Sequence, residues 1–85
     1  MKLLFAKTFV RDYRKLPQAI QEWTDKQLEL LLSNPKHPSL NVKKIRDPRD
    51  IWECRVTMSY RFTFQITDDT YILRKVGTHD ILRIP

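Results

Sequence analysis

Residues 51–66 read IWECRVTMSYRFTFQI, and this stretch decides the fold because apolar and polar side chains alternate along it. The apolar members are Trp52, Cys54 and Val56 before the connection at residues 58–59, and Tyr60, Phe62, Phe64 and Ile66 after it. Successive side chains of a strand point to opposite faces of a sheet, so the alternation predicts two strands with one buried and one open face. The short connection predicts that these strands are antiparallel neighbours.

The sequence before this pair predicts a strand and two helices. Residues 2–6 are expected to form the strand, and Thr8 is expected to cap the first helix through its hydroxyl. Pro17 interrupts the helical spacing of apolar residues and suits the first turn of a second helix, which ends at residues 34–35. Trp23 on that helix is expected to lie in the core.

The sequence around and after the central pair completes the sheet. Residues 42–46 predict a short strand, residues 47–50 and 67–69 predict turns, and residues 70–76 predict the last strand. Gly77, the only glycine, is expected to supply backbone freedom where that strand ends. These elements predict an α+β fold, in which an N-terminal strand and a two-helix hairpin pack on a largely antiparallel sheet of about four strands.

Length and composition fit a single domain over residues 1–85. Hydrophobic residues make up 41% of the chain, which is too apolar for a disordered protein. Cys54 is the only cysteine, so neither a disulfide framework nor a cysteine-based zinc site is expected, and the cytoplasm is the expected compartment. The apolar runs are short, so neither a signal peptide nor a membrane span is expected.

The net charge of +6 favours an anionic partner, such as nucleic acid, an acidic protein or a membrane surface. The excess is concentrated between Lys36 and Arg61, where seven basic residues accompany three acidic ones. A solvated surface that keeps the protein soluble explains the same charge. Alternation, however, places Arg55 and Arg61 together on the open face of the sheet, and a guanidinium grips phosphate at two points.

Four further side chains are candidates for chemistry, each with a plainer interpretation. His79 can exchange a proton near neutral pH, although a histidine in an exposed tail is more often inert. Lys43 and Lys44 either face an anion or protect an edge strand against aggregation. Glu53 either forms an ion pair with an arginine such as Arg55 or acts as a base.

These residue types suit phosphodiester cleavage without a metal or a cofactor. The chain has no Gly-rich phosphate loop, no metal-ligand cluster and no Ser-His-Asp arrangement. Cleavage of RNA needs a base for the 2′-hydroxyl, cations for the developing phosphorane charge and an acid for the leaving oxygen. Arginine, lysine and histidine can fill these roles, and the need for a 2′-hydroxyl would select RNA over DNA.

Four segments in this order resemble the RelE/ParE superfamily of toxins from bacterial and archaeal toxin–antitoxin pairs. They are KLLFAKTFVRDYRKLP at residues 2–17, HPSLNVKKIRD at 37–47, IWECRVTMSYRFTFQI at 51–66 and VGTHD at 76–80. The third segment resembles the family's central hairpin, with its W-E-x-R-V and Y-R motifs. The resemblance implies two helices against a curled antiparallel sheet, which agrees with the pattern of the residues.

The resemblance also implies two activities. RelE-like members cut mRNA in the ribosomal A site, whereas ParE-like members poison DNA gyrase and lack the nuclease residues. Arg61 falls where RelE-like nucleases keep a phosphate-stabilising arginine, and His79 falls where the YafQ-like branch has a catalytic histidine. Arg55 lies near a position where some members use a histidine. The expected site therefore has these three as catalytic residues, Glu53 as a helper, and as RNA-binding residues Lys43, Lys44, Arg46 and Arg83.

The leading hypothesis is a ribosome-dependent mRNA endonuclease toxin that uses no metal or cofactor. Its expected partners are a cognate acidic antitoxin, the ribosome and mRNA, with no membrane and no small-molecule substrate. The aromatic residue that RelE-like and YafQ-like enzymes carry close after the last catalytic position has no counterpart after His79. Two alternatives therefore stay open: a gyrase poison, and an inactive relative that only binds its antitoxin.

Overall fold

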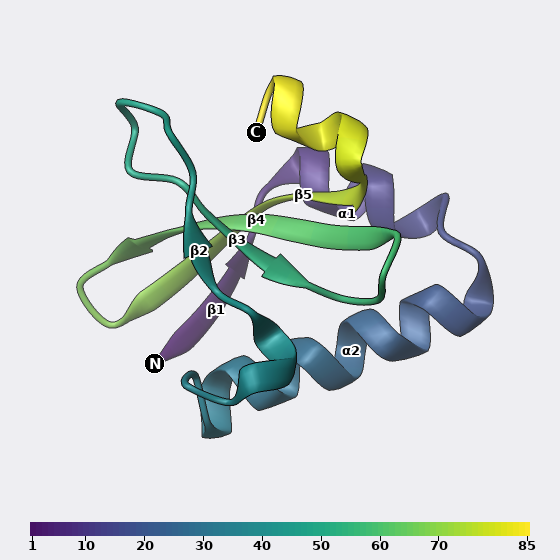
Figure 1. Cartoon of the computed structure of the whole chain (residues 1–85), viewed down its shortest axis with the longest axis horizontal. Helices are drawn as coiled ribbons and strands as arrows, with labels where there is room; N and C mark the ends of the chain where they lie inside the picture. The colour runs from purple at the N-terminus through teal and green to yellow at the C-terminus, as the bar shows by residue number, and fades with distance from the viewer.

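The chain forms one mixed sheet with both helices packed against it (Figure 1). The computed structural model describes residues 1–85. In chain order the elements are β1 (Lys2–Phe5), α1 (Lys7–Arg14), α2 (Gln18–Ser33), the 3₁₀ helix η1 (Pro38–Leu40), β2 (Lys43–Lys44), β3 (Trp52–Arg55), β4 (Tyr60–Thr67), β5 (Thr70–Thr78) and the 3₁₀ helix η2 (His79–Arg83). None of the helices combines the length and the apolar character that crossing a membrane requires.

The central hairpin that the alternation predicts is confirmed. Strands β3 and β4 are antiparallel neighbours, with Cys54 opposite Phe62 and Arg55 opposite Arg61. Strand β5 pairs antiparallel with the other side of β4. The predicted α+β class is also confirmed, with one difference in the sheet. It has five strands in the order β1-β5-β4-β3-β2, because β1 joins it as a parallel edge strand beside β5.

Strand β5 contains a bulge at Arg74. The register with β4 shifts between Thr63 and Phe64, which leaves Arg74 as an extra residue without a partner on β4. The extra residue resets the alternation, so Leu73 and Val76 both point into the core although they are three positions apart. The bulge therefore explains why the last strand carries a weaker alternating pattern than the two before it.

Helix α1 completes the edge of β5 where β1 ends. Strand β1 pairs only with the first four residues of β5. Further along, the hydroxyl of Thr8 donates to the carbonyl of Arg74, and the carboxylate of Asp12 accepts from the amide of Val76. The prediction that Thr8 caps the helix is wrong. Ala6 holds the cap position, and the Thr8 hydroxyl instead satisfies a strand carbonyl that has no neighbouring strand.

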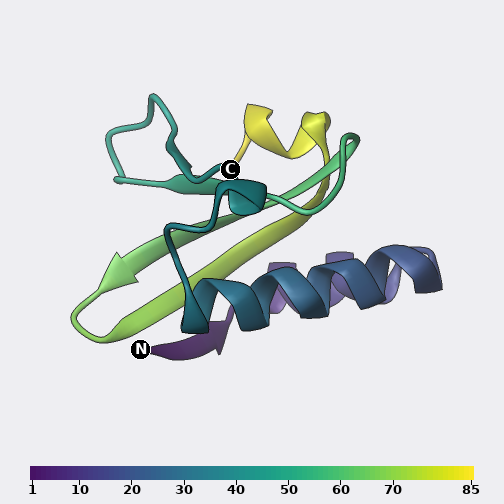
Figure 2. The same ribbon diagram turned by 60° about the horizontal axis from the view of Figure 1, so that its bottom comes forward.

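The hydrophobic core lies between the helices and the apolar face of the sheet, and Figure 2 shows both helices on one side of it. Phe62 and Phe64 of β4 are at most 1% exposed and pack with Phe9 of α1 and Leu31 of α2 in one cluster. Full burial of each such side chain is worth about 1.5–3 kcal/mol relative to exposure. Trp52 is partly buried and packs against this cluster.

Trp23 does not lie in the core, so this prediction is wrong. The side chain is 48% exposed, and the ammonium of Lys26 lies 5.0 Å from the centroid of its ring. The buried positions of α2 are Thr24, Gln27, Leu28 and Leu31. These lie on a single helix face, and a residue one position before Thr24 is rotated away from that face by about a quarter of a turn.

The predicted turns are present, and the short predicted strand is shorter than expected. Asp50 and Asp68 have φ of 55° and 51°, a left-handed conformation that aspartate tolerates better than most residues. Of the predicted strand at residues 42–46, only Lys43–Lys44 pairs with β3.

Residues 79–85 fold back over the polar face of the sheet, on the side opposite the helices (Figure 2). Gly77 pairs with Arg61 inside β5 and has no positive φ, so the prediction that it supplies backbone freedom is wrong. It supplies space instead, because a Cβ atom at this position would lie 2.9 Å from Cγ2 of Ile81. The segment ends against the sheet with Pro85 buried.

Candidate functional site

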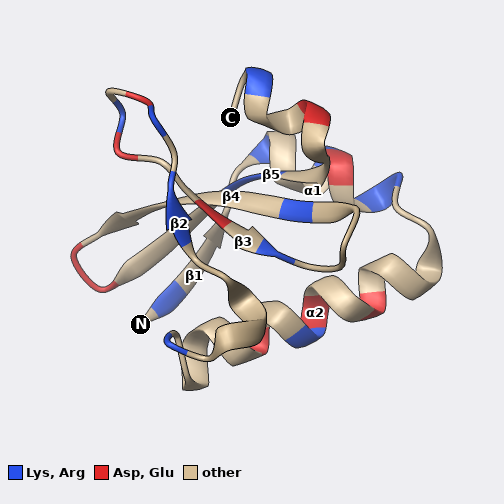
Figure 3. Cartoon of the chain, in the orientation of Figure 1, with Lys and Arg blue, Asp and Glu red and all other residues tan.

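Basic side chains from three neighbouring strands share the polar face of the sheet. Lys43 of β2 is opposite Glu53 of β3, and Arg55 of β3 is opposite Arg61 of β4. Directly opposite residues project from the same face, so the register brings these four side chains to one surface. Figure 3 shows the basic positions of β2, β3 and β4 beside one another, with the acidic position of β3 among them.

Arg61 is held on this face by an ion pair with Glu53. Its Nη1 donates to Glu53 Oε1 at 3.2 Å, and the two side chains are only 21% and 17% exposed. The structure thus pairs Glu53 with Arg61 rather than with Arg55. The Nε of Arg61 is buried and has no hydrogen-bond partner. A guanidinium with an unused buried donor is not fully satisfied by its protein partners.

Arg55 differs from Arg61 in exposure and in partners. Its side chain is exposed and forms no ion pair or hydrogen bond, and it lies directly across the strand from a like charge. Like charges that face each other destabilise a sheet pair, and an anion placed between them relieves the repulsion. Helix α2 fixes the backbone at this point, because the buried Gln27 donates to the Arg55 carbonyl at 2.9 Å.

The three other basic residues predicted near β2 do not all face the same way. Lys43 is exposed and opposite Glu53, on the polar face. Lys44 is opposite Trp52, with its ammonium 5.8 Å from the ring centroid, and it pairs with Asp50 at 2.9 Å. Lys44 therefore points away from Arg61, as a lysine that protects an edge strand does. Arg46 is exposed in the loop after β2 and forms no ion pair.

His79 follows the strand partner of Arg61 by two residues, whereas Arg83 lies farther along the same segment, in a separate hollow. Strand β5 ends with Thr78 opposite Tyr60, so His79 follows directly after the sheet, two residues beyond the partner of Arg61. His79 is exposed and its imidazole makes no hydrogen bond. Arg83 lines a separate hollow of about 370 Å³ with Arg11 of α1, so it is not part of the cluster around Arg61.

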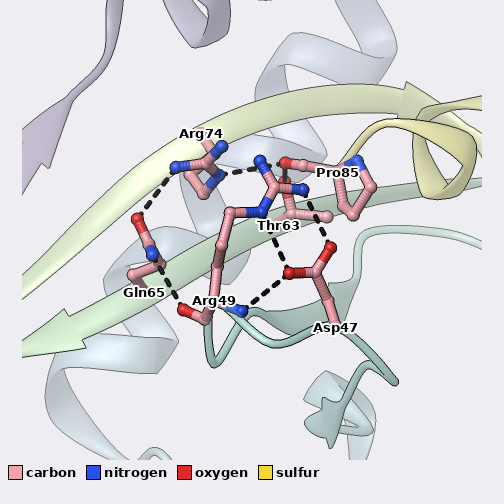
Figure 4. Close-up of polar contacts among 6 residues, drawn as sticks. All are labelled: Asp47, Arg49, Thr63, Gln65, Arg74 and Pro85. Atoms are coloured by element: carbon pink, nitrogen blue, oxygen red, sulfur yellow. Dashed lines mark hydrogen bonds and ion pairs between the residues drawn. The ribbon is translucent and has the colours of Figure 1, made fainter.

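A hydrogen-bonded network crosses the polar face beside this cluster (Figure 4). The Arg49 guanidinium donates two hydrogen bonds to the Asp47 carboxylate, from Nε at 2.9 Å and from Nη2 at 2.8 Å. These bonds lower the pKa of that carboxyl to about 2. Gln65 donates to the Arg49 carbonyl and accepts from Arg74, both at 2.9 Å. Arg74 Nε in turn donates to the backbone oxygen of Pro85 at 3.1 Å. The network joins the loop after β2 to residues 79–85.

Sequence reasoning missed this network because its members have no shared spacing. Residues 47–50 were identified only as a turn, Gln65 only as a polar strand residue, and Arg74 only as part of the last strand. The one available signal is the Asp-Pro-Arg order at residues 47–49, where an arginine two positions after an aspartate can fold back onto it.

Cys54 is not available as a nucleophile, and no ready-made cluster of metal-ligand side chains is present. The Cys54 thiol is fully buried, and this burial raises its pKa to about 12, which leaves it protonated and unreactive at neutral pH. Nowhere in the chain do three His, Cys, Asp or Glu side chains gather in a way that would hold a metal ion. The side chains that the register gathers on the polar face are those of two arginines, one lysine and one glutamate, and His79 follows β5.

Comparison with known proteins identifies relatives over almost the whole chain. Residues 3–82 match the family model described as the ParE toxin of the type II toxin–antitoxin system parDE. Toxin RelE3 of Methanocaldococcus jannaschii is 33% identical over 82 residues, which cover 89% of this chain and 88% of the relative.

Solved structures agree with this assignment at the level of the fold. The RelB–RelE antitoxin–toxin complex from Methanococcus jannaschii contains a chain that is 27% identical and superposes with a TM-score of 0.76, covering 96% of this chain and 99% of that one. YafQ from Escherichia coli strain BL21(DE3) superposes with a TM-score of 0.79 at 14% identity, covering 95% and 96%. The second likeness concerns the fold alone.

The ion pair between Glu53 and Arg61 yields a prediction about stability. Replacing Glu53 with alanine leaves a half-buried guanidinium unpaired, so the free energy of unfolding should fall by about 1–3 kcal/mol. Adding Arg61→Met should recover part of that loss, because the uncompensated charge is then gone. Urea denaturation of the two single variants and the double variant measures this coupling.

The exposed pair between Lys2 and Asp69 provides the matched control, and Lys2→Ala should change stability by about 0–1 kcal/mol. Strict additivity of Glu53→Ala and Arg61→Met would mean that the pair does not hold Arg61 in place.

Proposed function

The chain belongs to the RelE/ParE superfamily of toxins from type II toxin–antitoxin systems, and on that basis we propose that it is a ribosome-dependent mRNA endonuclease that blocks translation. The observation that carries the proposal is Arg61, a largely buried arginine that is oriented by Glu53, lies opposite Arg55 and has an unused donor. An arginine of this kind is expected where negative charge develops in a reaction.

The proposed roles follow from the position and chemistry of each side chain. Arg61 stabilises the charge of the phosphorane, and the exposed Arg55 across the strand binds an adjacent phosphate. His79 acts as general acid or base, since its imidazole is exposed and unengaged. Glu53 orients Arg61 through the 3.2 Å contact, and Lys43 adds positive charge at the rim of the face.

The proposed reaction is internal attack of the RNA 2′-hydroxyl on the neighbouring phosphorus. The 2′-hydroxyl gives its proton to a base, its oxygen bonds to phosphorus, and the bond from phosphorus to the 5′-oxygen of the next nucleotide breaks as that oxygen takes up a proton. The products are a 2′,3′-cyclic phosphate and a free 5′-hydroxyl. Arginine and histidine can supply the charge and the protons without a metal ion.

A gyrase poison is the second candidate, because the matching family model is that of the ParE toxin. Under this alternative the polar face of the sheet is incidental and a protein contact inhibits gyrase. The presence of both Arg61 and His79 favours the nuclease, since ParE-like toxins are expected to lack the nuclease residues. A supercoiling assay with purified gyrase separates the two: inhibition of gyrase together with intact mRNA on ribosomes supports the poison.

An acidic antitoxin is the proposed partner of this chain, and one of its surfaces suits such a segment. A hollow of about 450 Å³ on α1 is lined by Phe5 and Val10 and by four basic residues, Lys7, Arg11, Arg14 and Lys15. It adjoins an apolar hollow between the helices and lies beside the unpaired edge of β1. An acidic segment with apolar side chains would complement this surface in charge and in character. The RelB–RelE complex among the similar structures supports a partner of this class.

The roles of Arg61 and His79 predict the behaviour of two variants in growing cells. Arg61→Ala should lower mRNA cleavage by about 10²–10³-fold, because the phosphorane loses its stabilising charge. His79→Ala should lower it by about 10²–10⁴-fold through loss of proton transfer. Both variants should therefore fail to arrest growth, whereas Lys26→Ala on the opposite side of the sheet should arrest it. Normal arrest by folded Arg61→Ala and His79→Ala would show that the site is assigned wrongly.

The surface on α1 predicts the effect of charge reversal on antitoxin binding. Lys7→Glu combined with Arg14→Glu should slow association with the product of the neighbouring gene on the order of tenfold, because an acidic partner is then repelled from this hollow. Neither residue forms an ion pair within the chain, so the fold should be unaffected. Stopped-flow association at two salt concentrations measures this, with Lys26→Glu on α2 as control. Unchanged association of the reversed variant would place the antitoxin on another surface.

A further inference from the structure

Residues 79–85 are anchored to the polar face of the sheet at two separate points. Near the start of the segment, Ile81 packs onto Gly77, where only the absence of a Cβ atom leaves room for it. At the end, the backbone oxygen of Pro85 accepts from Thr63 Oγ1 and from Arg74 Nε, both at 3.1 Å. The segment is therefore attached to β5 near its start and to both β4 and β5 at its end.

The second anchor is buried at Thr63. Thr63 is 0% exposed although it alternates with the core residues Phe62 and Phe64, because residues 79–85 cover it. Its hydroxyl has no other partner than the Pro85 oxygen. Leaving a buried hydroxyl without a partner is unfavourable, so this contact defines the position of the segment well.

Arg74 connects this anchor to the rest of the polar face. The bulge in β5 turns Arg74 toward Gln65, which accepts from its Nη1 at 2.9 Å and donates to the carbonyl of Arg49. Gln65, itself held by Arg49, thus fixes one side of the guanidinium, and Pro85 accepts from the other. Figure 4 shows these contacts as a continuous path from the loop after β2 to Pro85.

The anchors determine where His79 can be. The residue before it, Thr78, pairs with Tyr60 in the sheet, and the residues after it are tied down at Ile81 and Pro85. His79 itself makes no hydrogen bond, so nothing on its own side chain restricts it. Its place beside the strand position of Arg61 depends on the segment that follows it.

We propose that Gly77, Thr63 and Arg74 are positioning residues that clamp residues 79–85 onto the sheet and thereby hold His79 at the polar face next to Arg61. The catalytic consequence of this clamp rests on the proposed function, whereas the clamp itself does not. The opposite role is a segment that shields the polar face from RNA. The two roles predict opposite effects of loosening the clamp on cleavage.

Two variants loosen the clamp at different points. Thr63→Val keeps the size and branching of the side chain but removes the donor to Pro85. Gly77→Ala places a methyl group 2.9 Å from Ile81 Cγ2, so Ile81 must shift and its packing against β5 is weakened. Thr70→Val is the matched control. The Thr70 hydroxyl contacts only the exposed Asp69, and Thr70 lies at the start of β5, the end of that strand farthest from residues 79–85.

The first measurement does not depend on any activity. Hydrogen exchange of residues 79–83 should rise about tenfold in both variants and stay unchanged in Thr70→Val. The His79 ring signals in NMR should move toward unstructured values, while those of His37, the only other histidine, should not. Unchanged exchange and unchanged His79 signals in both variants would overturn the clamp.

The second measurement is the rate of cleavage of ribosome-bound mRNA. Loss of position at the reacting groups should lower kcat by about 10–100-fold with little change in KM, and the effect should vanish in the His79→Ala background. An unchanged or faster rate in variants with loosened segments would overturn the positioning role. Absence of cleavage by the wild type would contradict the proposed function, and the exchange and NMR results would still decide whether the clamp holds His79.

Discussion

Strand β4 is the constraint on which the rest of the structure depends. It is paired on both sides, and its residues alternate between the core and the polar face, where Arg61 and Gln65 stay partly exposed. Phe62 is fully buried, and this fixes the direction of Arg61 one position before it. A slip of one residue would bury the arginine and expose the phenylalanine, at a cost that no other contact in the chain would offset. Burial of Phe62 in the core thus also fixes the face of the sheet on which Arg61 lies.

The candidate site combines one fixed positive charge, Arg61, with two exposed side chains, Arg55 and His79, that can contact a ligand. Glu53 holds Arg61 from one side, while Arg55 stays exposed across the strand. His79 enters from a different part of the chain, on a segment that returns over the sheet after β5. A rigid cation and an unengaged imidazole two residues beyond its strand partner are suitable groups for phosphoryl chemistry, in which positioning and charge supply most of the catalysis.

The sequence was sufficient to predict what depends on periodicity, and insufficient where contacts cross between distant segments. Alternation predicted β3, β4 and the shared face of Arg55 and Arg61 correctly, since a strand has only two faces. It did not predict that Thr8 serves the edge of β5 or that Thr63 is covered, because both depend on residues more than twenty positions away. Trp23 was assigned to the core as a member of the apolar side of the second helix, although α2 buries the adjacent face.

The proposed cleavage of RNA through its 2′-hydroxyl leaves characteristic chemical ends on the product, and these ends can be identified. Purified wild-type protein is added to ribosomes stalled on a defined mRNA, and the new ends are analysed. We expect a cut in the ribosomal A site with a 2′,3′-cyclic phosphate and a 5′-hydroxyl, and no such ends with Arg61→Ala. Intact mRNA with the wild type, or a product with a 3′-hydroxyl and a 5′-phosphate, would contradict this mechanism.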